Sequence, residues 1–232
     1  LAEEDKDIEI AAGVDPRGDT GASYPVYGSL SEVKETADVV IDFSIAAAVN
    51  DLIRDCEEKK LPLVICTTGL SDVQLAGLDR LSQKLPVLRS GNMSLGINTL
   101  LKVLKESAAV LISAGFDVEI IEKHHRHKLD APSGTAVMLA DAVSQASSAD
   151  YDYVYDRTGR REERPANEIG ISSVRGGSIP GDHEVIFAGE DEVISFSHRA
   201  YSRAVFGKGA ISAAKFLRGQ KAGMYSMGDV VG

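Results

Sequence analysis

The sequence of 232 residues has little of several features that mark whole classes of protein. It contains no tryptophan and only two cysteines, Cys56 and Cys66, which excludes a disulfide framework and fits a reducing compartment. No apolar run approaches the roughly 18 residues of a membrane span, and no segment resembles a signal peptide. Basic residues number 25 against 35 acidic ones, and a net charge of −10 argues against nonspecific nucleic-acid binding. We therefore expect a cytoplasmic protein whose partners include neither membranes nor nucleic acids.

The composition that remains is that of an ordinary globular protein, with 44% hydrophobic and 26% charged residues. The length suits one large domain or two modest ones. The first half alternates apolar strands, predicted over residues 8–14, 38–43, 61–66 and 85–88, with helices over residues 46–60 and 71–84. Apolar strands separated by helices are typical of a parallel sheet covered on both faces. This half is expected to be α/β, a Rossmann-like doubly wound parallel sheet.

After residue 94 the pattern changes to longer helices and strands in succession. Helices are predicted over residues 95–112, 134–147 and 204–217, and strands over residues 117–122, 168–175, 182–188 and 192–198. Successive strands joined by glycine-rich turns indicate an α+β domain with a mixed sheet. Two domains are expected: residues 1–94 with 204–232, and residues 95–203. The charged, tyrosine-rich segment 150–164 is interpreted as a surface loop.

Asp15 ends the first predicted strand, where a dinucleotide-binding fold holds the adenosine ribose 2′-hydroxyl. An aspartate before a proline is also a common turn starter, which on pattern alone is the favoured interpretation. The glycine-rich phosphate turn of such a fold lies about 20 residues before the acid, and counting back from Asp15 passes the first residue, Leu1. No G-x-G-x-x-G motif occurs in the chain. Either the chain binds no dinucleotide, or a strand, the turn and part of a helix lie outside this sequence.

Three further loops follow predicted strands, at residues 42–44, 66–69 and 90–94. Each could be an ordinary turn with a serine or asparagine capping the next helix. Open α/β sheets, however, bind ligands at the carboxyl ends of their strands. Three polar or glycine-containing loops on one sheet edge therefore favour a ligand crevice.

Residues 119–136 are the most informative stretch of the chain. Three of its five histidines, His124, His125 and His127, lie here with Arg126 and Lys128. This cluster suits a dianionic small molecule and proton transfer near neutral pH. The following Pro-Ser-Gly-Thr sequence begins a helix whose N-terminal amides could bind a carboxylate or phosphate.

Two plainer interpretations of this cluster are less favoured. A metal site lacks neighbouring cysteines, and H-H-x-H spacing on a strand splits the side chains between two faces. A merely solvated charged face explains neither the turn nor the apolar strand before it. A catalytic site for a small anion is the favoured hypothesis, and no metal is expected.

Residues 119–136 closely resemble the signature of the dihydrodipicolinate reductases, also called 4-hydroxy-tetrahydrodipicolinate reductases, of the diaminopimelate route to lysine. Further family landmarks stand at residues 42–44, 67–69, 92–96, 175–183 and 202–203. The family begins with a strand and a glycine-rich loop over the pyrophosphate, which this sequence lacks. We therefore expect about 20 residues to lie outside it.

The resemblance implies an NADH- or NADPH-dependent oxidoreductase that acts on a small dicarboxylate and assembles as a homotetramer. His124 and Lys128 match the family's acid/base residues. The positions that match substrate-binding residues are His125, Lys128, Ser133, Gly134 and Thr135. The positions implied for cofactor binding are Asp15, Arg17, Phe43, Cys66, Thr67, Thr68, Ser90, Gly91, Asn92, Met93 and Arg203. A carboxylate at Asp15 favours NADH, and Arg17 could offset its repulsion of the NADPH phosphate, so NADH is expected to be favoured or used equally.

Two other functions stay open from the sequence. A non-catalytic, family-like binding protein would follow if the natural chain has no phosphate loop. A reductase of the aspartate-semialdehyde type would need a nucleophilic cysteine, whereas Cys66 lies in the expected cofactor loop.

Overall fold

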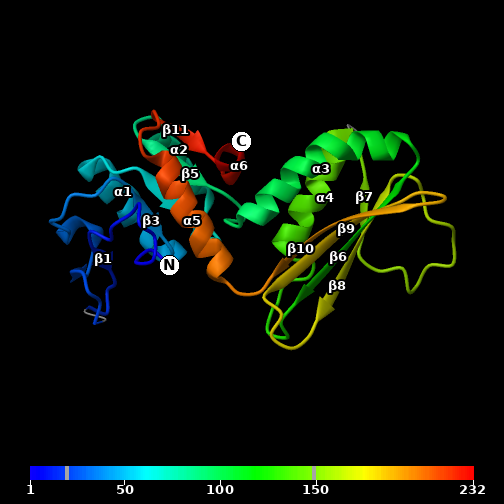
Figure 1. Cartoon of the computed structure of the whole chain (residues 1–232), viewed down its shortest axis with the longest axis horizontal. Coiled ribbons are helices and arrows are strands. Elements are labelled where there is room, and N and C mark those ends of the chain that lie inside the picture. Colours follow the sequence, from blue (N-terminus) through cyan, green and yellow to red (C-terminus); the bar gives the residue numbers. More distant parts are fainter. Residues whose placement is uncertain (19–20, 148–149) are drawn as a thin grey trace. The chain divides into compact units, whose positions relative to one another are not determined.

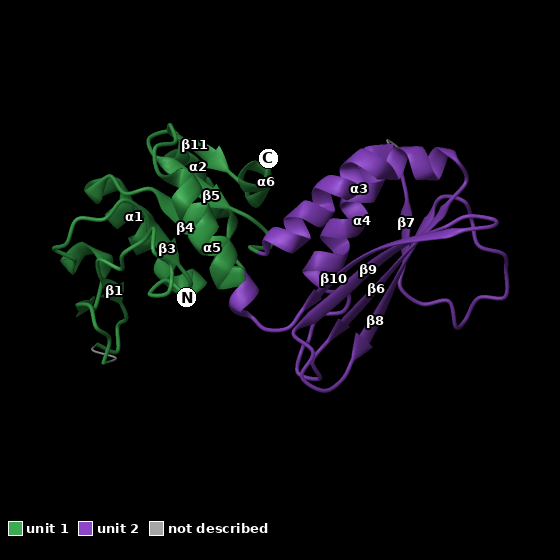
Figure 2. Cartoon of the chain, in the orientation of Figure 1, with its two compact units in different colours: residues 1–93, 206–232 green, residues 94–205 purple. Residues whose placement is uncertain are grey.

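The computed structural model describes residues 1–18, 21–147 and 150–232. The chain forms two compact units: unit 1 is Leu1–Met93 with Phe206–Gly232, and unit 2 is Ser94–Val205 (Figures 1 and 2). The sequence placed the first boundary after residue 94 and the second after residue 203.

Unit 1 contains a parallel sheet of four short strands in the order β11-β5-β4-β3 (Figure 1). The strands are β3 (Val40–Asp42), β4 (Leu63–Ile65), β5 (Pro86–Arg89) and β11 (Gly223–Tyr225). Its helices are α1 (Val49–Lys59), α2 (Asp72–Ser82), α5 (Ala204–Leu217) and α6 (Met227–Val231), with 3-10 turns η1 (Leu30–Glu32) and η2 (Ala46–Ala48). Helix α2 begins at Ser71, whose side chain and that of Gln74 form a reciprocal capping box.

The central strand β4 shows why both faces of this sheet are covered. Leu63 and Ile65 pack in one core with residues of α1 and α2, whereas Val64 packs in a second core with residues of α5 and α6. Alternate residues of a strand point to opposite faces, so a strand buried on both sides has no polar position. The predicted doubly wound α/β arrangement is confirmed.

The predicted strand over residues 8–14 is wrong in extent. Only β1 (Gly13–Val14) is a strand, and it pairs in parallel with β2 (Val26–Tyr27) in a separate two-stranded sheet. A strand exists only where a neighbour's backbone groups lie opposite it. Here the contacts run from Gly13 N to Pro25 O and from Asp15 N to Tyr27 O, which leaves residues 8–12 outside the ladder.

Unit 2 is built on a five-stranded sheet in the order β10-β9-β6-β8-β7. The strands are β6 (Asp117–His124), β7 (Asp152–Val154), β8 (Glu168–Arg175), β9 (Gly181–Ala188) and β10 (Val193–Ala200). Strand β6 runs parallel to β8 and antiparallel to β9, so the sheet is mixed, as predicted. The core lies between the sheet and two helices, α3 (Leu95–Ser113) and α4 (Gly134–Ser147).

The segment 150–164, interpreted from sequence as a surface loop, contains β7 and a network of ion pairs. Arg157 pairs with Glu119 (2.6 Å), Arg160 with Glu168 (2.8 Å), and Arg164 with Asp117 (2.6 Å). These pairs hold the segment against β6 and β8. Among the described residues, no helix combines the length and the apolar character that crossing a membrane requires.

Candidate active site

The site is built at the carboxyl end of β6, where two polar residues continue a row of core side chains. Val118, Ile120, Glu122 and His124 all have buried side chains, because residues two apart on a strand share one face. Glu122 is 0% exposed and His124 is 8% exposed. A carboxylate and an imidazole in such a position need partners, since burying an unpaired charge is costly.

Both oxygens of the Glu122 carboxylate are occupied. Oε2 lies 2.6 Å from His124 Nδ1 and accepts from an Arg175 amino group at 2.7 Å. Oε1 accepts from the second Arg175 amino group at 2.6 Å, from the Ser173 hydroxyl at 2.8 Å and from the Ser133 backbone amide at 3.1 Å. Burial alone would raise the pKa of Glu122, but hydrogen bonds from Arg175, His124 and Ser173 outweigh it and lower the pKa to about 2.

The turn that precedes α4 brings the predicted substrate residues to the same place. The Ser133 hydroxyl accepts from the Ala136 amide at 3.1 Å and lies 3.1 Å from Nε2 of His183. Gly134 and Thr135 are the first residues of α4, so their amides belong to its N-terminal turn. The turn therefore presents backbone donors beside the buried carboxylate and imidazole.

Cationic and imidazole groups gather near His125. Lys128 pairs with Asp130 at 2.9 Å. Burial lowers the pKa of His125, and the charges of Arg203, His124, His127 and Lys128 lower it further. Arg203, predicted as a cofactor residue, is therefore close enough to His125 to act on it electrostatically. His124, His125, Lys128, Ser133, Gly134, Thr135 and Arg203 all belong to unit 2.

His183 was missed by the sequence reasoning. Its ring meets that of His124 edge to face, with centroids 5.1 Å apart. Burial, followed by the charge of His124, lowers the pKa of His183 to about 4, so the ring is neutral at pH 7. Glu122, Ser173 and Arg175 were also missed as site residues. Glu122 could have been found from the sequence, because it shares a strand face with His124. Ser173, Arg175 and His183 could not, because the pairing register of β8 and β9 with β6 places them beside Glu122 and His124.

The predicted cofactor residues lie in unit 1, with the exception of Arg203. Asp42, at the end of β3, accepts from the Thr67 hydroxyl at 2.6 Å and from the Ser44 amide at 3.0 Å, which joins two of the three predicted loops. Phe43, between Asp42 and Ser44 in the sequence, is 58% exposed. Cys66 and Thr68 flank Thr67, and burial raises the pKa of the Cys66 thiol to about 12, so this thiol is not an activated nucleophile.

The third predicted loop spans residues 90–94, of which Ser94 is the N-cap of α3. The part at residues 90–93 follows β5 and belongs to unit 1. It carries Ser90, Gly91 and Asn92, and its last residue, Met93, is buried in the core with α5 and α6. Gly209 of α5 lies against the Met93 carbonyl so closely that an added Cβ would be 1.7 Å from the oxygen. Helix α5 therefore supports this loop through backbone contact.

Asp15 follows β1 and is paired with a near neighbour. Arg17 donates to its carboxylate from the backbone amide at 2.9 Å and from the guanidinium at 3.0 and 3.2 Å. The Arg17 side chain is 88% exposed. These hydrogen bonds lower the pKa of Asp15, so a negative charge is held at this strand end at neutral pH.

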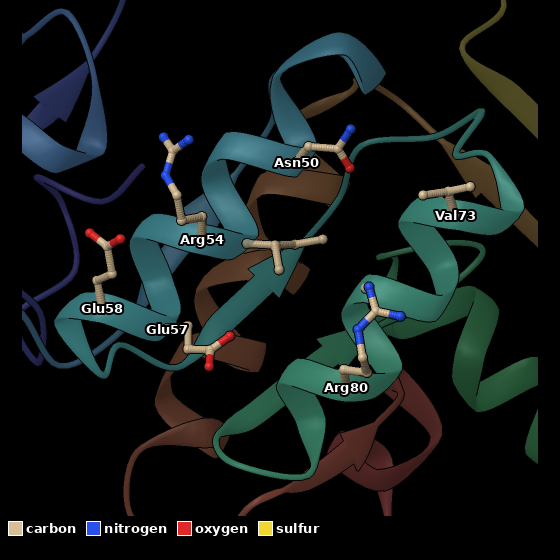
Figure 3. A pocket seen from close by; sticks show the side chains of 8 residues that line it. Asn50, Arg54, Glu57, Glu58, Val73 and Arg80 are labelled. Carbon is tan, nitrogen blue, oxygen red and sulfur yellow. The ribbon is translucent and has the colours of Figure 1, made fainter.

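A pocket elsewhere in unit 1 contains none of the predicted site residues. It lies between α1 and α2, and Figure 3 shows Arg54, Glu57 and Glu58 projecting from α1 and Arg80 from α2. Arg54 is already paired with Asp51 and Asp55, and opposite charges alternate around the pocket. In the described part of the chain, no group of three or more His, Cys, Asp or Glu side chains is arranged to hold a metal ion.

Acidification should weaken the fold through His183. An unfolded His183 would bind a proton near pH 6.5, whereas the folded ring does so only near pH 4, so stability is lost as pH falls through this interval. The expected contribution is up to about 1.4 kcal/mol per pH unit. Urea unfolding between pH 7 and pH 4 should show a shallower pH dependence for His183→Gln than for the wild type. The exposed His127→Gln control should keep the wild-type slope, and equal slopes for all three proteins would contradict this account.

Comparison with known proteins agrees with this arrangement over the whole chain. The family model described as dihydrodipicolinate reductase, N-terminus, matches residues 1–93, and the model for its C-terminus matches residues 96–231. A 4-hydroxy-tetrahydrodipicolinate reductase of Caldanaerobacter subterraneus subsp. tengcongensis is 54% identical over 231 residues, covering 100% of this chain and 91% of the relative. One from Clostridium tetani is 47% identical, covering 95% and 86%. The solved structure of a dipicolinate-bound dihydrodipicolinate reductase from Paenisporosarcina sp. TG-14 has a TM-score of 0.78 and 28% identity, covering 98% of this chain and 91% of that chain.

Proposed function

The chain belongs to the dihydrodipicolinate (4-hydroxy-tetrahydrodipicolinate) reductase family, oxidoreductases of the diaminopimelate route to lysine, and from this premise we propose how its residues divide the reaction. Unit 2 holds a small cyclic dicarboxylate, and unit 1 holds a pyridine nucleotide. The observation that carries the proposal is that three groups meet at the ring of His183. The ring of the buried His124 lies 5.1 Å from it, the Ser133 hydroxyl before α4 lies 3.1 Å from it, and the charge of Lys128 acts on it.

The residues at the strand ends of unit 1 fit a nicotinamide nucleotide. Phe43 offers an exposed aromatic face, and Gly69, at φ +72°, has open space where a Cβ would stand. Thr67 and Thr68 lie between them, and the loop at residues 90–93 ends the next strand. Asp15 would accept from the adenosine ribose, as an acid after an early strand does in dinucleotide folds. When bound, the nucleotide supplies the hydride.

The substrate's two carboxylates are held by the donors of unit 2. The amides of Gly134 and Thr135 at the start of α4 bind one carboxylate, with the helix dipole favouring negative charge there. Lys128 and His125 bind the other carboxylate through charge and hydrogen bonds. Neutralising the carboxylates matters for rate as well as affinity, because hydride arrives on a molecule that is already a dianion.

The proton comes from His124, with Lys128 as the second donor. The overall change is loss of water from the hydroxylated ring and addition of one hydride and one proton. The hydride adds to a carbon conjugated with the ring imine, and the electron pair displaced onto the neighbouring carbon takes the proton. The Nδ1 atom of His124 is engaged by Glu122, which leaves Nε2 as the nitrogen that faces the substrate.

A direct assay tests this function. Freshly generated 4-hydroxy-tetrahydrodipicolinate should cause the purified protein to oxidise NADH or NADPH, followed by nicotinamide absorbance. Free dipicolinate should inhibit competitively with the substrate, because it is a flat dicarboxylate of the same size. Absence of nucleotide oxidation by a protein that binds dipicolinate would leave only the non-catalytic alternative.

The choice between nucleotides is proposed to depend on Asp15. Its ionised carboxylate favours the 2′-hydroxyl of NADH and repels the 2′-phosphate of NADPH, while Arg17 offsets part of this repulsion. We expect kcat/KM for NADH to equal or exceed that for NADPH, and Asp15→Asn to shift the ratio toward NADPH. A wild-type preference for NADPH above about tenfold, equivalent to about 1.4 kcal/mol, would contradict the role of Asp15.

We propose further that the protein assembles as a homotetramer through the sheet of unit 2. The family resemblance suggests this assembly, and the exposed Val174 of β8 and Val193 of β10 belong to the sheet that would form the contact. Sedimentation equilibrium should give the mass of four chains, and a monomer at micromolar concentration would contradict this.

A further inference from the structure

In the reaction as described so far, the buried carboxylate of Glu122 does no more than engage Nδ1 of His124. It is 0% exposed, carries no contact with solvent, and yet is kept ionised by its hydrogen bonds. A buried ionic group lowers the stability of the fold unless all its hydrogen-bond and charge partners are in place. An apolar residue would fill this part of the core with a smaller desolvation penalty. The two oxygens of this carboxylate have different sets of partners, and each set belongs to a different part of the site.

The Oε2 side fixes the state of His124. A carboxylate can only accept, so Nδ1 of His124, at 2.6 Å, must carry the hydrogen. In the neutral ring this leaves Nε2 bare, and in the charged ring it makes Nε2–H the proton that can leave. Gly181 keeps that edge of the ring uncrowded, since an added Cβ would stand 3.1 Å from Nε2.

The Oε1 side reaches the carboxylate-binding turn. Oε1 accepts a hydrogen bond from the backbone amide of Ser133 at 3.1 Å, and Ser133 immediately precedes the first residue of α4. Arg175 bridges both oxygens and also donates to the Asp130 carbonyl at 2.7 Å, so the turn is held at two points. A bidentate guanidinium of this kind fixes the plane of the carboxylate.

We propose that Glu122 is a positioning residue that sets the tautomer of His124 and holds it in register with the turn that binds the substrate carboxylates. One rigid group thereby determines both where the substrate lies and which nitrogen faces it. The inference rests on the proposed function for the catalytic role of His124, but the tautomer itself is a property of the protein without substrate.

The first test reads the tautomer directly. Nitrogen-15 NMR of the full-length, histidine-labelled protein distinguishes a ring nitrogen that carries hydrogen from one that is bare. The signals of His124 are those lost in His124→Gln. At a pH where the ring is neutral, we expect hydrogen on Nδ1 and a bare Nε2. Hydrogen on Nε2 of the wild-type ring would overturn the proposal, whatever the outcome of the activity assay.

The second test separates positioning from mere stability. Glu122→Asp keeps the charge but withdraws it from Nδ1, and Glu122→Gln keeps the shape but removes the charge. Both should lower kcat at least about tenfold, with KM for the nucleotide unchanged.

Glu168→Gln is the matched control. Glu168 is equally buried on the neighbouring strand and pairs with Arg157 and Arg160, but it has no contact with His124. It should lower the unfolding free energy while keeping the wild-type kcat and the wild-type tautomer of His124. A kcat for folded Glu122→Gln equal to that of Glu168→Gln would refute positioning. Loss of the proposed function is a separate result, recognised when His124→Gln itself retains full turnover while the tautomer is as expected.

Discussion

Replacing His124 with glutamine should lower kcat by roughly 10²- to 10⁴-fold, the usual contribution of a positioned acid or base. Glutamine retains a polar side chain near the buried Glu122 but has no proton to give to a carbon atom at neutral pH. Binding of the nucleotide should not change, because the predicted nucleotide residues lie mostly in unit 1. Steady-state kinetics with both substrates varied would give kcat and both KM values.

The control for this variant is His127→Gln. His127 belongs to the same histidine cluster, but its side chain is exposed and its nearest ring, that of His125, lies 6.3 Å away. Its kcat should stay within about twofold of wild type, a free-energy difference below about 0.5 kcal/mol. If His124→Gln and His127→Gln have the same kcat, the acid is another residue.

Lys128→Ala should weaken both substrate binding and proton transfer. Its ammonium would bind a substrate carboxylate and act as the second proton donor, so KM for the dicarboxylate should rise as kcat falls by about two orders of magnitude. Circular dichroism should remain that of wild type, because the partly buried Lys128 side chain pairs with Asp130 and is not one of the hydrophobic core residues. Near-normal turnover in this variant would remove Lys128 from the proton pathway.

The long helices were predictable from the sequence because each buries one continuous apolar face. The long helix predicted over residues 95–112 is α3 (Leu95–Ser113), and the helix predicted over residues 134–147 is α4 (Gly134–Ser147). Both carry an apolar face long enough to show its period. The strands β7 and β11 were missed although β3 and β4, which are equally short, were predicted. Unlike β3 and β4, neither lies in an apolar run of the sequence. Each is an edge strand that pairs with a single neighbour, β8 or β5.

The site was predictable where its residues are close in sequence. The stretch from His124 to Thr135 carries its chemistry locally, and the structure brings it together at the end of β6 and the start of α4. The supports of the site come from far away: Arg175 reaches Glu122 across 53 positions, and His183 reaches Ser133 across 50. Strand register, which sets these contacts, is decided by the packing of the whole sheet.

Gly209→Ala should lower the unfolding free energy by about 3 kcal/mol, the upper part of the range for overpacking a core. The added Cβ would meet the Met93 carbonyl oxygen at 1.7 Å and its carbon at 2.7 Å. Both atoms are backbone, so relief requires α5 or the loop at residues 90–93 to move. Because that loop is proposed to touch the nucleotide, KM for the nucleotide should rise while KM for the dicarboxylate stays near its wild-type value.

Gly207→Ala, two positions earlier on the same helix, is the matched control. Its Cβ would meet only the Cδ1 atom of Leu1 at 2.9 Å, the end of a flexible and half-exposed side chain that can rotate away. Alanine also favours a helix over glycine by up to about 1 kcal/mol, so stability should be unchanged or slightly higher. Urea unfolding of the two variants therefore compares the same substitution in two settings: an added Cβ that contacts a fixed backbone carbonyl, and one that contacts a mobile side chain. Equal unfolding free energies would mean that α5 does not rest on the backbone of this loop.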